Sequence, residues 1–113
     1  MAISDNQMAQ GAIERNDLLR RATNMLKDTR EHFNSGEFQK VVTDVNRLEA
    51  SNAPADLVLE GILWRARARA ELGQREAART DYERFVKNTP LSDASRTRAM
   101  EELTALSTRG PGL

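Results

Sequence analysis

Three arginines, Arg65, Arg67 and Arg69, occupy every second position of the stretch GILWRARARAELGQREAA, residues 61–78, which is otherwise rich in Ile, Leu, Trp and Ala. On a strand, all three guanidinium groups would lie on one face. On a helix, at about 100° per residue, Arg65 and Arg69 lie on nearly the same line while Arg67 points to the opposite side. What the arginines can bind therefore depends on the secondary structure of this stretch.

The other residues that could do chemistry do not form a catalytic set. His32 is the only histidine; Asp28 lies one helical turn before it, and no nucleophile or metal ligand is spaced to join it, so we expect a surface or partly packed role. The adjacent carboxylates of Glu101 and Glu102 diverge on a helix and are expected to face solvent. The sequence has no Gly-rich phosphate loop, HExxH motif or calcium loop. We therefore predict no enzyme activity, no cofactor and no metal site.

Composition restricts the class of protein further. The 113 residues are enough for one domain, and 39% hydrophobic residues can form one modest core. Seventeen basic and seventeen acidic side chains leave no net charge, which argues against a nucleic-acid partner. No segment approaches the roughly 18 apolar residues of a membrane span. The absence of cysteine leaves the compartment open: cytoplasmic by default, with a mature periplasmic or exported domain as the alternative.

Helix is the expected structure of almost the whole chain, because proline occurs only at 54, 90 and 111 and the one β-branched run, VVTDV, has helical spacing. Apolar residues recur every three or four positions in residues 18–33, 38–48, 62–70, 78–85 and 99–106. Ser4 and Gln7 have capping-box spacing, so the first helix extends over residues 5–34 or follows a frayed tail up to about Gly11. The last helix is expected at residues 92–107. The three arginines therefore lie on a helix.

The chain repeats itself with a period of 37 residues. Gly36, Gly73 and Gly110 are spaced at this interval, and the same shift aligns Leu26 with Leu63. Further aligned apolar or small positions are Met25, Ile62 and Ala99; Thr29, Ala66 and Leu103; Val41 and Ala78; Val45 and Tyr82; Leu48 and Phe85. Each unit reads as a helix, a turn around glycine and a second helix, and the third unit stops after its first helix.

These units resemble the tetratricopeptide repeat, a hairpin of two helices. The best match covers residues 59–90, with Ala66 and Ala78 at the small positions, Gly73 in the turn, Tyr82 at the aromatic position and Pro90 ending the unit. The resemblance implies an all-α fold: a right-handed superhelical stack of antiparallel helix hairpins, with about five helices. It divides the domain, residues 17–108, into units 17–54, 55–90 and 91–108. Residues 1–16 are then a tail or helix extension, and residues 109–113 are a C-terminal tail.

In this family the first helix of each hairpin lines a concave groove. Carried over position by position, the resemblance places eight residues in the groove: Leu26, Arg30, Phe33, Leu63, Arg67, Glu71, Thr97 and Glu101. Arg67 would face a ligand. The alternative is that all three arginines lay their stems on apolar surface with their charged heads in water, which is the expectation for Arg65 and Arg69 and stays open for Arg67. Trp64 is expected to pack between helices.

The resemblance implies a non-catalytic protein-protein interaction module, an adaptor or chaperone that holds a helix or peptide of another protein. Leu26, Phe33 and Leu63 would supply apolar contacts, and Arg30 and Arg67 would pair with carboxylates or backbone carbonyls of the partner. Two alternatives stay open. The chain is a self-assembly unit, a homo-oligomer or a fragment of a longer array, or it is a small chaperone of the kind that serves bacterial secretion systems.

Overall fold

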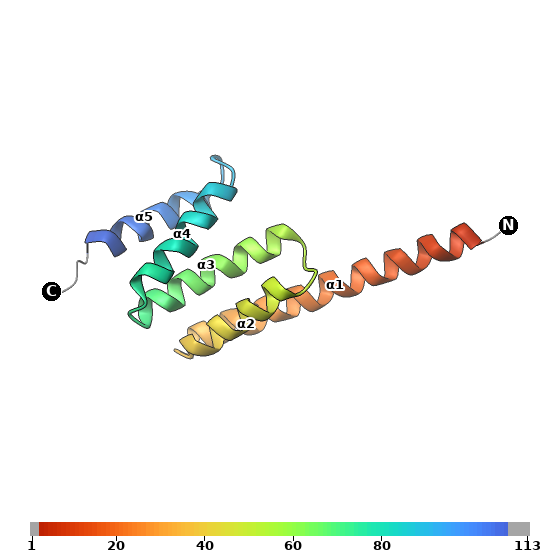
Figure 1. The fold of residues 1–113 in the computed structure, drawn as a ribbon, viewed down its shortest axis with the longest axis horizontal. Coiled ribbons are helices and arrows are strands. Elements are labelled where there is room, and N and C mark those ends of the chain that lie inside the picture. The colour runs from red at the N-terminus through yellow and green to blue at the C-terminus, as the bar shows by residue number, and fades with distance from the viewer. Residues whose placement is uncertain (1–2, 109–113) are drawn as a thin grey trace.

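The computed structural model describes the backbone of residues 3–108 and the side chains from residue 15 onward, and the C-terminal tail expected at residues 109–113 lies outside this range. The described part is all-α (Figure 1). Its five helices are α1 (Ile3–Asn34), α2 (Phe38–Ala50), α3 (Ala55–Glu71), α4 (Arg75–Asn88) and α5 (Ala94–Thr108). The stretch with the three arginines is helical, as predicted, and belongs mostly to α3.

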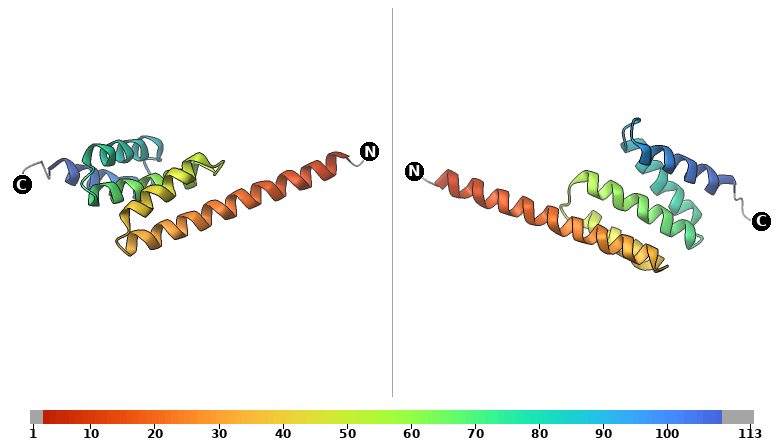
Figure 2. Two further views of the ribbon diagram at one scale, coloured as in Figure 1. Left: turned by 60° about the horizontal axis from the view of Figure 1, so that its bottom comes forward. Right: turned by 180° about the vertical axis from the view of Figure 1, so that it is seen from behind.

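Helix α1 is much longer than the others. Its 32 residues correspond to about 48 Å at 1.5 Å per residue. The second half packs against α2 and α3, while the first half projects away from the rest of the molecule in every view (Figures 1 and 2). The molecule is consequently elongated, with extents of 70 × 30 × 19 Å.

The two turns inside the hairpins α1–α2 and α3–α4 are copies of each other. Gly36 and Gly73 have φ values of 76° and 79°, a left-handed conformation that glycine adopts without strain. In the first turn the Glu37 amide donates to the His32 carbonyl at 2.8 Å, and in the second the Gln74 amide donates to the Arg69 carbonyl at 2.8 Å. Every one of these positions is shifted by 37 residues, so the period read from the sequence is present in the backbone.

The core follows the same period up to the last helix. Val41, Val45 and Leu48 on α2 are buried, and so are their counterparts Ala78, Tyr82 and Phe85 on α4. Leu26 and Leu63, the aligned pair on α1 and α3, are both buried as well. On α5 the corresponding Met100 is 44% exposed, because no described element covers this side of the helix. Leu19, at the start of the first apolar stripe, is also exposed.

Substituting Ala78 with leucine should test the tight approach of α4 to the core. Ala78 is completely buried in the cluster that contains Ile62, Ala66 and Tyr82. The added side-chain volume should overpack this cluster and lower the free energy of unfolding by about 1–3 kcal/mol. Urea denaturation measures the change, and Ala50→Leu at an exposed helix end is the control. Equal stability of the two variants would contradict this packing.

Candidate functional site

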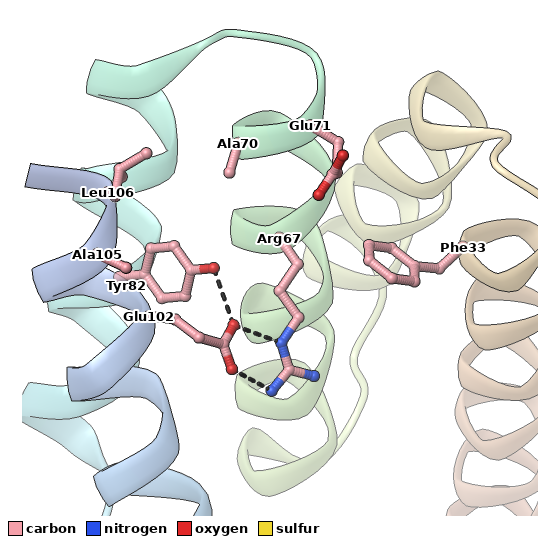
Figure 3. Close-up of a pocket in the computed structure, with 8 residues that line it drawn as sticks. All are labelled: Phe33, Arg67, Ala70, Glu71, Tyr82, Glu102, Ala105 and Leu106. Carbon is pink, nitrogen blue, oxygen red and sulfur yellow. Dashed lines mark hydrogen bonds and ion pairs between the residues drawn. The ribbon is translucent and has the colours of Figure 1, made fainter. Parts of the chain in front are cut away.

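The Arg67 side chain joins α3 to α5. Its Nε donates to Oε1 of Glu102 at 2.8 Å, and its Nη2 donates to Oε2 at 2.9 Å (Figure 3). The Tyr82 hydroxyl of α4 donates to the same Oε1 at 3.0 Å. On its other side the guanidinium carbon lies 5.0 Å from the centre of the Trp64 ring, a cation–π contact. Arg67 is thus fixed, and its charge is balanced within the chain.

An open pocket of about 230 Å³ lies beside this ion pair. It is lined by Phe33, Arg67, Ala70, Glu71, Tyr82, Glu102, Ala105 and Leu106, which come from α1, α3, α4 and α5 (Figure 3). The pocket has a largely apolar lining, and its volume is sufficient for one side chain of a ligand. We call it the Glu71 pocket, because Glu71 is the one charged residue of its lining that forms no ion pair with any described side chain.

A second open pocket, also of about 230 Å³, lies nearer the beginning of α3. Its apolar residues include Leu59 and Leu63 of α3 and Phe85 of α4, and Asp56 and Asp93 contribute carboxylates. We call it the Asp56 pocket. On α3 the two pockets follow one line at helical spacing: residues 56, 60 and 63 line the Asp56 pocket, and residues 67, 70 and 71 line the Glu71 pocket. We call the surface formed by both pockets the α3/α5 seam.

The side chains that line the α3/α5 seam carry an excess of negative charge, although the chain as a whole has none. Arg75, which donates to the Leu106 carbonyl at 2.6 Å, is not among the lining residues. One arginine and five carboxylates line the two pockets. Arg67 pairs with Glu102, and Arg30 of α1 reaches Glu60 at 2.8 Å. Three carboxylates, on Asp56, Glu71 and Asp93, are left without an ion pair among the described side chains.

Tyr82 is held in its neutral form at this site. Burial raises the pKa of Tyr82, and the neighbouring Glu102 carboxylate raises it further. The phenol therefore keeps its proton and acts as a hydrogen-bond donor to Glu102. It cannot serve as a base near neutral pH.

The opposite side of α3 holds a network of buried charges. Arg65 is only 5% exposed, and it donates to both oxygens of Asp81 on α4 at 2.9 Å each. It also donates to Asn46 and Glu49 of α2, while Arg69 donates to Asp81 at 2.8 Å. The expectation that the head of Arg65 lies in water is therefore wrong, because four acceptors on two other helices draw it inside.

These contacts keep the network charged. Burial by itself lowers the pKa of Arg65, but the bonds to Asp81 and Glu49 outweigh it, so the pKa is raised. Burial by itself raises the pKa of Glu49, and the bonds from Arg84 and Arg65 outweigh that effect, so the pKa is lowered. The network connects α2, α3 and α4, and it therefore fixes how the two hairpins lie against each other.

The eight groove residues expected from the sequence are divided among different places. Phe33, Arg67 and Glu71 line the Glu71 pocket. Leu63 lines the Asp56 pocket, but it is only 5% exposed and belongs mainly to the core. The remaining four do not line the seam. Leu26 is 2% exposed and packs against α3, and Arg30 pairs with Glu60. Thr97 and Glu101 lie exposed along α5, where they line a separate open pocket of about 570 Å³.

Two polar residues of the seam were not foreseen in these roles. Glu102 was expected to face solvent but binds Arg67, and Tyr82 was expected only as a packing residue but also binds Glu102. No local sequence pattern predicts that Glu102 binds Arg67, because this pair forms only when α5 lies at one particular displacement along α3. His32, for which a surface or partly packed role is expected, is partly buried and pairs with Asp44 of α2 at 2.6 Å.

Neither a metal-binding cluster nor a membrane-spanning helix is present in the described part of the chain. Among the side chains of residues 15–108, no group of three or more His, Cys, Asp or Glu is placed to hold a metal ion. Within residues 3–108, no helix is sufficiently long and apolar to cross a membrane.

No protein-family model matches this chain, and no curated protein or solved structure matches it. The likeness to tetratricopeptide repeats therefore stays a prediction from the sequence.

Proposed function

We propose that this chain is a non-catalytic protein-protein interaction module, an adaptor or chaperone that holds a helix or extended peptide of a partner protein in the α3/α5 seam. The hairpins would form a right-handed superhelical stack similar to that of tetratricopeptide repeats, with α1, α3 and α5 on the binding side. The observation that carries the proposal is the alignment of two open pockets with apolar lining along one helix, α3.

The chemistry of the seam favours recognition over catalysis. Its one tyrosine is kept protonated, its one arginine is neutralised by Glu102, and its apolar residues come from four helices. Apolar pockets with a few polar groups at the rim are typical of surfaces that receive side chains of a bound segment.

Self-assembly is the second candidate, favoured by exposed apolar side chains outside the seam. Leu91, in the turn before α5, is 79% exposed, and Met100, on the uncovered side of α5, is 44% exposed. A second copy could cover them, and sedimentation of the purified chain over a range of concentrations would reveal such a dimer.

A filled pocket tests the proposed binding site. Ala105 is exposed on α5 and lines the Glu71 pocket, so Ala105→Trp should occupy the pocket without disturbing the core. Peptides selected from a random displayed library on the unmodified chain should bind this variant at least about tenfold more weakly, which corresponds to about 1.4 kcal/mol. Fluorescence anisotropy with labelled peptides measures the affinities.

Thr104→Trp is the matched control, because Thr104 is exposed on the same helix and lines neither pocket. It should bind the selected peptides as the unmodified chain does. A library that yields no binding peptide, or peptides that bind both variants equally, would contradict the proposed function.

A further inference from the structure

We infer that the α3/α5 seam takes a basic, apolar segment: two apolar side chains with Lys or Arg beside them. The inference rests on the proposed function and adds the chemistry of the partner. It differs from the expectation from the sequence, in which Arg30 and Arg67 would pair with carboxylates or backbone carbonyls of the partner.

Both arginines already pair with carboxylates of this chain. Arg67 makes two bonds to Glu102, and its side chain is only 19% exposed. A carboxylate from a partner could reach Arg67 only by breaking these bonds, which would leave Glu102 unpaired beside the neutral Tyr82 hydroxyl. Arg30 makes a single bond to Glu60, at 2.8 Å, and this pair is more exposed than the pair of Arg67 and Glu102. An acidic ligand at Arg67 would therefore lose as much pairing as it gains.

Carboxylates without an ion pair among the described side chains lie at both ends of the seam. Glu71 is exposed at one pocket, and Asp56 and Asp93 lie at the other. Asp93 also accepts a hydrogen bond from the Ser95 amide at 2.8 Å, but this donor is neutral and does not cancel the charge of the carboxylate. A ligand with Lys or Arg next to each apolar anchor would match this charge, and it would be steered toward the seam at low salt.

The distance between the two pockets along α3 predicts how far apart the apolar residues of the bound segment are. On α3, Leu59 and Leu63 of the Asp56 pocket precede Ala70 of the Glu71 pocket by eleven and seven residues. At 1.5 Å per residue these intervals are about 10–16 Å. A bound helix would span them with apolar residues seven to eleven positions apart. An extended peptide, at about 3.3 Å per residue, needs three to five positions.

The charge of selected peptides tests this inference. A random displayed peptide library selected on the full chain should give sequences with two apolar residues at these spacings and a net positive charge. Their affinity should fall about tenfold with Glu71→Lys, which replaces attraction by repulsion, and it should also fall between 50 and 500 mM NaCl as screening increases. Glu83→Lys is the matched control, because it makes the same change of net charge at an exposed position of α4 outside both pockets.

The possible failures are distinguishable. Peptides that are displaced by Ala105→Trp but are acidic or uncharged, or that respond alike to Glu71→Lys and Glu83→Lys, would overturn the inference and leave the proposed binding site in place. Self-association of the chain that Ala105→Trp abolishes would overturn the inference in favour of a second copy as the occupant. Binding peptides that are insensitive to Ala105→Trp would overturn the proposed function itself.

Discussion

Replacing Asp81 with alanine is expected to lower the free energy of unfolding by about 3–5 kcal/mol, since it removes the buried carboxylate that Arg65 and Arg69 share and leaves both cations with fewer acceptors. Asp81 is 3% exposed and accepts three hydrogen bonds, two from Arg65 and one from Arg69. Without Asp81, Arg65 would stay buried with only its α2 acceptors, Asn46 and Glu49. Urea denaturation followed by circular dichroism measures the loss.

Glu83→Ala is the control for this substitution. Glu83 lies two residues further along α4 and is exposed, so its removal should change stability by less than about 0.5 kcal/mol. The variant Arg65→Leu should be destabilised comparably to Asp81→Ala, and the loss in the double variant should be well below the sum of the two single losses. Additive losses would show that the two residues act independently and would contradict the network.

The substitution Gly61→Leu is expected to cost about 3 kcal/mol, at the upper end of the usual range for overpacking. At Gly61, α3 lies close to the first hairpin. A Cβ atom there would lie 2.8 Å from Cδ2 of Leu48, 3.4 Å from Cγ1 of Val45 and 3.6 Å from Cδ2 of Leu26. These three side chains are buried and have little room to move. Thermal and urea denaturation give the change in stability.

A double-mutant cycle with Gly61→Ala isolates the close contact. Alanine favours helix over glycine by about 1 kcal/mol, but in the unmodified chain the clash with Leu48 should cancel that gain. In a Leu48→Ala background the clash is absent, and Gly61→Ala should then be stabilising. The same effect in both backgrounds would mean that α3 does not approach α2 as closely as described.

Much of the fold is determined locally and could be predicted from the sequence. The 37-residue period placed Gly36 and Gly73 in equivalent turns, and both have positive φ values and matching hydrogen bonds. The helical spacing of apolar residues identified most of the core, including Val41, Val45 and Leu48. These features depend on residues within one or two helical turns of each other, so the sequence alone contains the information.

The sequence also separated Arg67 from Arg65 and Arg69, because 100° per residue places them on opposite sides of a helix. It could not tell what each side would meet. Whether a guanidinium reaches water, a ligand or a carboxylate depends on residues 12 to 35 positions away. These residues come close only when α2 and α4 pack on α3 and α5 packs on α4.

Tertiary packing therefore determined which charged side chains are buried, which form ion pairs and which stay unpaired. It buried Arg65 against Asp81, paired Arg67 with Glu102, and left Glu71 and Asp56 as unpaired charges of the seam. It also moved Leu26 into the core, since an apolar residue on the stripe that binds neighbouring helices cannot at the same time present its side chain to a ligand. Ion pairing acts through space and requires atoms within about 4 Å, so it is fixed by the displacement of one helix along another, which no local pattern of residues specifies.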